Sequence, residues 1–313
     1  MTKKRVVLAL GGNALQRDGE VSAEAQKKVA MSVGEVVADL SRKYEIVIAH
    51  GNGPQVGNIL IHEETAASVA APAMPLETAV AMSQGQIGYW LAQAIGNAFL
   101  RRGMKRKVVT VVSQVVVDRK DPAFANPTKP IGQFYDAKTA LKLAREKGWV
   151  VREDAGRGWR RVVASPKPVD IVEKRTIADL VADGAIVIAA GGGGIPVYRT
   201  KVLKRLRGVD AVIDKDFAAE KLAELVGADM FVSVTAVPNA YINYGTPEQE
   251  AIFKTTVGEL ARLEKQGYFK AGSMLPKVEA AMQFAKKGGV GIITDIEMLE
   301  LALAKKAGTV VTK

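Results

Sequence analysis

The chain has 313 residues, of which 48% are hydrophobic, and its 44 basic and 33 acidic side chains give a net charge of +11. It has no cysteine, which excludes disulfides, thiolate catalysis and thiolate metal sites, and its two histidines argue against a zinc enzyme. No apolar run approaches the roughly 20 residues of a membrane span, and residues 1–5 lead into a strand without the apolar stretch of a signal peptide, so we expect a cytoplasmic protein without membrane contact.

The excess of positive charge does not by itself indicate nucleic-acid binding. Basic residues are spread along the chain in short pairs such as 101–102, 160–161 and 286–287, and aromatic residues make up only 6% of the sequence. Aromatic and basic residues are not interleaved, as they are on single-strand binding surfaces. Solvated helix ends and a few phosphate-facing lysines explain the charge more simply, so a basic nucleic-acid-binding protein is kept only as the weakest alternative.

Short apolar runs alternate with amphipathic segments along the chain. The pattern predicts strands at 6–10, 46–50, 107–117, 185–190, 230–235, 290–294 and 309–312. It predicts helices at 23–44, 84–102, 136–147, 175–183, 217–226, 256–266, 276–287 and from about 296. Ser83, the Thr256–Glu259 pair and Pro276 are predicted to mark helix starts. This order predicts one α/β domain over 1–313, with a mostly parallel sheet and helices on both faces.

Three glycine-rich turns each follow a predicted buried strand: GGN at 11–13, GNG at 51–53 and GGGG at 191–194. A turn that leaves a strand and opens a helix exposes backbone N–H groups, and glycine lets an anion approach them. The carboxyl ends of parallel strands meet at one edge of the sheet, where such proteins bind ligands. The three turns therefore predict one crevice for a polyanion, and nucleotide phosphates are the first candidate.

Residues 118–168 differ from the rest of the chain. They contain prolines and glycines with little periodicity, around a short helix and short strands, and they predict an excursion from the main sheet. A decorative insertion and a lid over the ligand site are equally compatible with this pattern.

Familiar phosphate-binding motifs are absent from the sequence. There is no G-x-x-x-x-G-K-[ST] loop, and the protein-kinase motifs are missing. The glycine run at 51–57 is one residue too long for the dinucleotide fingerprint, and no acidic residue lies about 20 positions further on. A nucleotide site must therefore use another scaffold.

Three lysines stand where a bound phosphate would explain them. Lys129 lies between prolines, Lys215 lies between two aspartates at a strand-to-helix junction, and Lys277 follows Pro276 at a helix start. A cation at a helix N-terminus opposes the macrodipole at a cost of some tenths of a kcal/mol, and a bound phosphate would reverse the sign.

Segments in order over the whole chain resemble the carbamate kinases, which have the amino-acid-kinase fold. These segments are LALGGNA (8–14), HGNGPQVGN (50–58), SQGQIGYW (83–90), NPTKPIG (126–132), EDAGRGWR (153–160), SPKP (165–168), GGGGIPV (191–197), VIDKD (212–216), GSMLPK (272–277) and GTVVTK (308–313). The resemblance implies an open three-layer αβα sandwich with a protruding lobe over 118–168. It also implies a homodimer, whose activity is reversible phosphoryl transfer between ATP and carbamate, giving ADP and carbamoyl phosphate.

The resemblance also assigns roles to residues, with Mg²⁺ carried by the nucleotide phosphates and no protein metal ligand. The catalytic set that it implies is Lys129, Lys215, Asp216 and Lys277. The set that holds the transferred phosphoryl group and carbamate is Gly11, Gly12, Asn13, Gly51, Asn52 and Gly53. The nucleotide set is Gly192, Gly193, Asp214, Tyr244, Met274 and Pro276.

A few positions bear on the choice within the family. Many related kinases carry a lysine where this chain has Ala9, which favours a carbamate kinase over the alternative, a small-acid kinase such as acetylglutamate kinase. Gln133 and the segment 236–239 depart from the family pattern, the latter where the adenosine pocket is expected. His50, at a strand end, is interpreted as structural or substrate-adjacent, since an ionised carbamate oxygen needs no general base.

Overall fold

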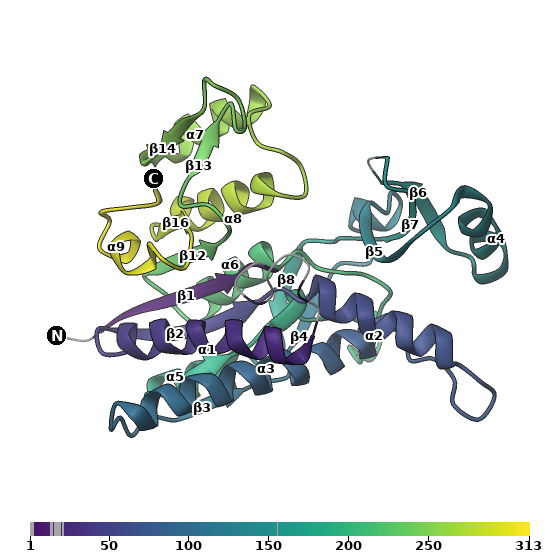
Figure 1. Ribbon diagram of the computed structural model, residues 1–313, viewed down its shortest axis with the longest axis horizontal. Coiled ribbons are helices and arrows are strands. Elements are labelled where there is room, and N and C mark those ends of the chain that lie inside the picture. Colours follow the sequence, from purple (N-terminus) through teal and green to yellow (C-terminus); the bar gives the residue numbers. More distant parts are fainter. Residues whose placement is uncertain (1–2, 13–14, 16–19, 21, 155) are drawn as a thin grey trace.

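An eight-stranded sheet forms the centre of the protein in the computed structural model, which describes residues 3–12, 15, 20, 22–154 and 156–313 (Figure 1). The strand order is β15-β17-β16-β12-β1-β2-β9-β3, and each neighbouring pair is parallel except β16 with β17. The strands are β1 (Lys4–Leu10), β2 (Tyr44–His50), β3 (Val108–Thr110), β9 (Ile186–Ile188), β12 (Met230–Val234), β15 (Lys254–Thr256), β16 (Val290–Thr294) and β17 (Thr309–Thr312).

Helices cover both faces of this sheet. One face carries α1 (Ala23–Leu40), α3 (Leu76–Arg101) and α9 (Leu299–Leu303), and the other carries α5 (Lys174–Ala182), α6 (Lys215–Leu225), α7 (Val257–Lys265) and α8 (Met274–Lys286). Alternate side chains of β1 supply the two cores, because Val6 and Leu8 pack with the first group while Val7 and Ala9 pack with the second. The predicted three-layer αβα architecture is confirmed.

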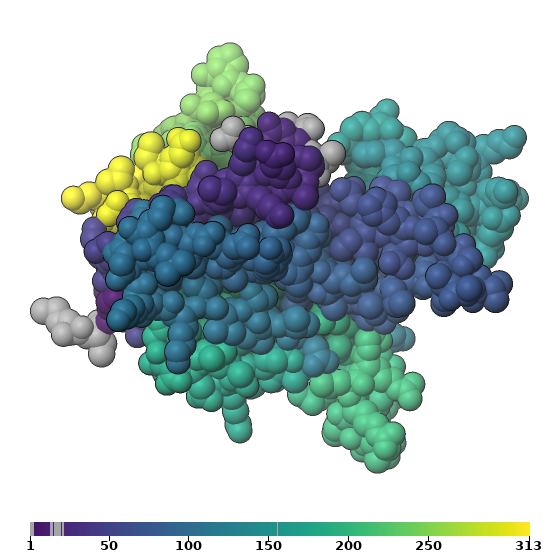
Figure 2. Space-filling view, turned by 60° about the horizontal axis from the view of Figure 1, so that its bottom comes forward, coloured from purple at the N-terminus to yellow at the C-terminus, as the bar shows by residue number. Residues whose placement is uncertain are grey.

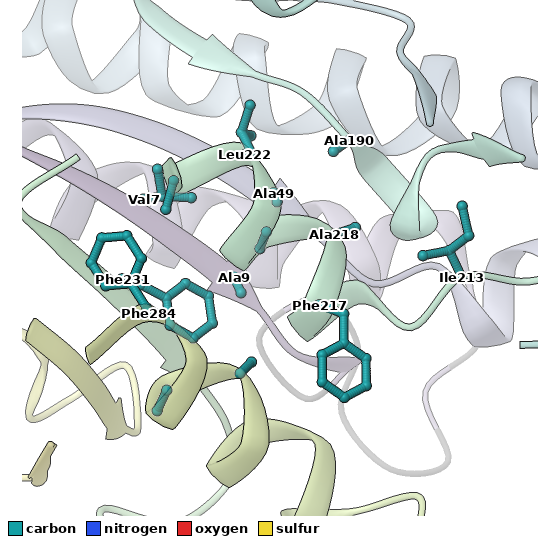
Figure 3. Packing of buried hydrophobic residues seen from close by; sticks show 14 of the residues in the cluster. Val7, Ala9, Ala49, Ala190, Ile213, Phe217, Ala218, Leu222, Phe231 and Phe284 are labelled. Carbon is teal, nitrogen blue, oxygen red and sulfur yellow. The ribbon is translucent and has the colours of Figure 1, made fainter. Parts of the chain in front are cut away.

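Small residues bring α6 close to the sheet. Ala9 and Ala49 on the strands lie near Ala218 on the helix, and the phenyl rings of Phe231 and Phe284 pack beside them with centroids 6.1 Å apart (Figure 3). The close approach of α6 matters for function, since its first turn carries Lys215 and Asp216 at the edge of the sheet.

A smaller sheet and a lobe complete the molecule. The smaller sheet has the order β11-β10-β4-β8, with β4 (Gln114–Val117), β8 (Pro168–Ile171), β10 (Ile195–Arg199) and β11 (Leu206–Gly208). The lobe consists of β5 (Lys129–Tyr135), α4 (Ala137–Lys147), β6 (Val150–Glu153) and β7 (Trp159–Val163). The remaining short elements are β13 (Ala240–Ile242), β14 (Glu250–Ile252) and the 3-10 helices η2 (Pro122–Phe124) and η3 (Gly191–Gly193).

The lobe protrudes from the body next to α2 (Gly53–Ala66), and both views show the two side by side (Figures 1 and 2). Its helix α4 starts at the N-cap Asp136 and ends at Gly148 in the left-handed conformation, so both predicted ends of this helix are confirmed. The capping box of Thr256 and Glu259 at the start of α7 is also confirmed.

Several predicted elements were wrong in detail. Helix α3 begins at Leu76, and Ser83 is buried inside it, where its hydroxyl donates to the Val80 carbonyl instead of capping a helix start. The predicted strand 107–117 is two strands, because the chain leaves the main sheet after Thr110 and enters the smaller sheet at Gln114. Helix α2 was not predicted, since glycine and proline at its start hide the helical pattern.

In the part of the chain that the structure describes, none of the helices is both long enough and apolar enough to cross a membrane.

Candidate active site

A cleft of about 560 Å³ lies beyond the carboxyl ends of β1, β2 and β9. Gly12, residues 51–53 and Gly192, which follow these three strands, line it. The first turns of α2 and α6 also reach it, as do the residues that precede α8. Amide groups in the first turn of a helix have no acceptor within the helix, so an anion in this cleft meets several helix N-termini. The predicted convergence of the glycine turns on one crevice agrees with this geometry.

An ion-pair cluster occupies the floor of the cleft. The carboxylate of Asp216 accepts from Lys215 Nζ at 2.8 Å through one oxygen and from Lys277 Nζ at 3.0 Å through the other. Ser233 on β12 donates to the same carboxylate at 2.6 Å, and Lys215 Nζ also lies 3.5 Å from the Ala9 carbonyl oxygen. Asp216 is 2% exposed, so it is inaccessible to solvent and serves to hold the two lysines at fixed positions.

The charges in this cluster are set by burial and by one another. Burial raises the pKa of the Asp216 carboxyl, but the ammonium groups of Lys215 and Lys277 outweigh burial and hold that pKa below its usual range. Burial lowers the pKa of the Lys215 ammonium below its usual value, and Asp216 offsets part of this effect. The cluster carries two cations against one carboxylate, which leaves one positive charge for a ligand.

A third lysine comes from the lobe. Lys129 starts β5, and its Nζ lies 3.0 Å from the carboxylate of Asp214. Asp214 is the N-cap of α6, where its other oxygen accepts from the amide of Asp216 at 3.0 Å. The structure thus brings together all four residues of the predicted catalytic set, Lys129, Lys215, Asp216 and Lys277, and all four line the cleft.

The first two glycine turns contribute space more than free amides. The amide of Gly11 donates to the Val234 carbonyl and that of Gly51 donates to the Leu10 carbonyl, each at 2.9 Å. The expectation that these two amides are open to a ligand was therefore wrong, because the strands continue their ladder through them. At Gly51, a Cβ would lie 3.2 Å from Cδ of Lys215, so glycine lets that side chain pass. Gly12, Asn52 and Gly53 line the cleft, whereas Asn13 lies outside the described residues.

The third glycine turn, 191–194, is a site of close packing. Gly192 has φ of +66°, lines the cleft, and would overlap the Asn52 carboxamide if it carried a Cβ. Gly193 has φ of +86° and would overlap the Ile213 carbonyl oxygen. Both positions therefore require glycine for conformation as well as for space.

Only some of the residues predicted to bind the nucleotide line the cleft. Asp214 and Gly192 line the cleft, while Gly193 packs behind it. Met274 and Pro276 lie in the first turn of α8, next to the lining residues Gly272 and Ser273 but not among them. Tyr244 follows β13, is 63% exposed and packs its ring on Tyr241 with centroids 5.8 Å apart, away from the cleft lining.

Arg160 on β7 also lines the cleft and was not predicted as a site residue. Its guanidinium donates to the Gly132 carbonyl at 2.9 Å, pairs with Asp154 at 3.3 Å and lies over the Phe134 ring at 5.0 Å. These contacts hold the cation on the inner side of the lobe. Its place in the EDAGRGWR segment was the signal that could have found it.

His50 is buried where β2 ends, with its Nδ1 donating to the Gly51 carbonyl at 2.9 Å and its ring against Gly191. Burial lowers the pKa of His50 to about 4, and the hydrogen bond to Gly51 offsets only part of this effect. The imidazole is neutral at pH 7 and shapes the turn that carries Asn52.

Comparison with known proteins agrees with this fold and site. The model described as "Amino acid kinase family" matches residues 4–294, so the chain belongs to the amino acid kinase family. Within this family the chain is similar to carbamate kinases, including that of Pyrococcus horikoshii (52% identity, covering 99% of both chains) and carbamate kinase 1 of Enterococcus faecium (49% identity, covering 99% of both). The solved carbamate kinase from Giardia lamblia bound to AMP-PNP has a TM-score of 0.93 and 43% identity, covering 100% of this chain and 99% of that one.

Similarity of this extent confirms the predicted class of enzyme, a carbamate kinase, and does not favour the alternatives of an acetylglutamate kinase or a nucleic-acid-binding protein.

Proposed function

We propose that this chain transfers a phosphoryl group reversibly between ATP and carbamate, giving ADP and carbamoyl phosphate, through the residues that line its cleft. The observation that carries the proposal is that three lysines from separate segments meet in one cleft, held there by Asp214 and Asp216. The named activities of the relatives in Pyrococcus horikoshii and Enterococcus faecium, both carbamate kinases, support the choice of substrate.

The main obstacle to this reaction is electrostatic, because the donor and the acceptor are both anions. One lysine about 4 Å from a phosphoryl oxygen, in an effective dielectric near 20, contributes roughly 4 kcal/mol. Lys129, Lys215 and Lys277 neutralise charge on the moving group, and Asp216 fixes the direction of two of them. Carbamate already carries an ionised oxygen, so no general base is required, which agrees with a neutral, buried His50.

The acceptor and the transferred group lie, in this proposal, against the turns at Gly11, Gly12, Asn13 and 51–53. The nucleotide lies toward Gly192, Gly193, Asp214, Met274 and Pro276, with Tyr244 near the adenosine. The Giardia lamblia relative with bound AMP-PNP supports a nucleotide site on this fold. The lobe over 118–168 acts as a lid, because it carries Lys129 and Arg160 on its cleft side.

The donor set of the cleft fits Mg²⁺ carried by the nucleotide phosphates. Among the described residues no group of three or more His, Asp or Glu side chains is placed to hold a metal ion, and Asp214 and Asp216 both face lysines. Bound to phosphate oxygens, Mg²⁺ supplies further charge neutralisation. The homodimer and the cytoplasmic location stay predictions from the sequence and its resemblance.

The direct test is ATP formation from ADP with a panel of acyl phosphates. Purified protein with Mg²⁺ is given carbamoyl phosphate, acetyl phosphate or N-acetylglutamyl phosphate, and ATP is measured by luciferase emission. We expect carbamoyl phosphate to be preferred by at least about 100-fold in kcat/KM. Equal or greater turnover of N-acetylglutamyl phosphate would contradict the proposal and favour the acetylglutamate kinase alternative.

A further inference from the structure

Asn52 occupies the N-cap of α2 but does not cap it. An asparagine at this position ordinarily accepts a hydrogen bond from the amide of the second or third helical residue. In α2 the second helical residue is Pro54, which has no amide hydrogen, and the third is Gln55. The Asn52 side chain makes no capping bond, so the first-turn amides of α2 have no side-chain acceptor among the residues that the structure describes.

Ser83, deep within α3, explains where the Asn52 side chain goes instead. The amide nitrogen of Asn52 donates to Ser83 Oγ at 2.8 Å, and Ser83 Oγ donates to the Val80 carbonyl at 2.7 Å. Since the hydroxyl hydrogen is engaged with Val80, Ser83 can only accept from Asn52, which fixes which end of the carboxamide faces the helix. Ser83 is fully buried and does not line the cleft.

Gly192 packs against the same carboxamide. A Cβ at Gly192 would overlap the Asn52 amide group, so only glycine at this position lets the carboxamide lie against the turn at 191–194. Asn52 is 5% exposed although its residue lines the cleft. The side chain is thus held between α3 and the third glycine turn, away from the amides of α2.

We propose that Ser83 is a positioning residue for phosphoryl transfer. By holding the carboxamide of Asn52 away from α2, it keeps the start of this helix, where Gly53 lines the cleft, open to the anionic substrate. This inference rests on the proposed function, since it assigns the open helix end to the phosphoryl and carbamate side of that same site. Loss of the Ser83 hydroxyl frees the carboxamide to rotate and cap α2 itself.

The first test measures steady-state kinetics of Ser83→Ala. Loss of one neutral hydrogen bond corresponds to about a tenfold effect. We expect KM for carbamoyl phosphate to rise by about tenfold, with KM for ADP changed less than twofold. Ser32→Ala is the matched control, because Ser32 on α1 makes a similar bond to the Lys28 carbonyl at an exposed position and should leave both KM values unchanged. An unchanged KM for carbamoyl phosphate in Ser83→Ala would overturn the inference.

A double-mutant cycle separates positioning from packing. If Ser83 acts through Asn52, then Ser83→Ala adds less than a twofold effect in a protein that already carries Asn52→Ala. The same tenfold loss in both backgrounds would mean that Ser83 acts independently of Asn52, and the inference would fail.

Binding of inorganic phosphate, measured by calorimetry, tests the inference apart from turnover. We expect the wild-type protein to bind phosphate about tenfold more tightly than Ser83→Ala does. The affinity of Ser32→Ala for phosphate should equal that of the wild type. This result would support the inference even if the wild-type protein did not turn over carbamoyl phosphate, an outcome that would reject only the proposed function. Equal affinity in wild type and Ser83→Ala, or no phosphate binding by the wild type, would overturn the inference.

Discussion

Nζ of Lys129, at the start of the lobe, lies 3.0 Å from Oδ2 of Asp214, the residue that caps α6. The other oxygen of the same carboxylate holds the amide of Asp216, whose side chain in turn holds Lys215 and Lys277. One carboxylate therefore joins the protruding lobe to the buried cluster at the base of the cleft. The position of the lobe and the placement of the cleft lysines are thus linked through Asp214.

Removal of either central lysine should abolish most turnover. We expect Lys215→Ala and Lys129→Ala each to lower kcat by at least about 100-fold. Each substitution removes a cation that is held in place to neutralise the charge on the moving phosphoryl group. ATP formation from ADP and carbamoyl phosphate measures the loss, and circular dichroism checks the fold. Lys142→Ala, on the outer surface of the lobe with 67% of its side chain exposed, is the control and should turn over normally. Near-normal turnover in both cleft variants would contradict the roles assigned to these lysines.

Asp216→Asn should affect both stability and the pH profile. The substitution leaves two largely buried ammonium groups without their shared carboxylate, and breaking a buried pair in this way costs about 3–5 kcal/mol. Urea unfolding at pH 7 measures this loss. Asp179→Asn on the exposed side of α5 is the matched control and should stay within about 0.5 kcal/mol of wild type.

In the same variant, the loss of activity with rising pH should begin at a lower pH than in the wild type. Burial already lowers the pKa of Lys215, and Asp216 raises it back, so loss of the carboxylate lowers that pKa further. Deprotonation of Lys215 then begins at a lower pH than in wild type. An alkaline limb of log kcat that does not move in Asp216→Asn would show that Lys215 does not control it.

The sequence was sufficient to predict the layers of the fold and the edge at which the site lies. The strands Val290–Thr294 and Thr309–Thr312 were located to the residue, because the polar turns that flank a buried apolar run fix where the strand begins and ends. The capping box of Thr256 and Glu259 was equally local and was confirmed. The lysines at helix starts were noticed because their charge opposes the local dipole.

Features that depend on contacts distant in sequence could not be predicted. Ser83 has the residue type of an N-cap, and only the folded structure shows that its hydroxyl lies inside α3, where it accepts a hydrogen bond from the Asn52 carboxamide. The amides of Gly11 and Gly51 were expected to be open to a ligand, because a turn considered in isolation exposes them. In the folded protein the neighbouring strands supply their acceptors. Arg160 reaches the cleft only through the fold of the lobe.

Acid should destabilise the protein through His50. Burial lowers its pKa from 6.5 to about 4, so the folded protein binds this proton less readily than the unfolded chain. The neutral imidazole contributes stability above pH 6.5, and that stability is lost as the pH falls from 6.5 toward 4, by at most about 1.4 kcal/mol per pH unit.

Urea unfolding across this range compares wild type with His50→Gln. Between pH 6.5 and 4.5, the unfolding free energy of the variant should fall less steeply with decreasing pH than that of the wild type. The difference in slope should reach at most about 1.4 kcal/mol per pH unit, which corresponds to one proton. Between pH 7 and 8 the two slopes should be equal. Equal slopes over the acidic range would mean that the buried imidazole does not drive the acid loss.

A methyl group at Gly192 should disable the site more than it destabilises the fold. The Cβ of Gly192→Ala would overlap the Asn52 carboxamide, and φ of +66° disfavours alanine by roughly 1–2 kcal/mol. Displacing Asn52 disturbs the start of α2 at the cleft, so we expect kcat/KM for carbamoyl phosphate to fall by about 100-fold or more. Gly96→Ala is the control, because Gly96 lies in α3 with open space at its Cβ position and alanine there should stabilise the helix by up to about 1 kcal/mol. Equal activity of the two variants would show that the fit of Asn52 against the third glycine turn is not needed for phosphoryl transfer.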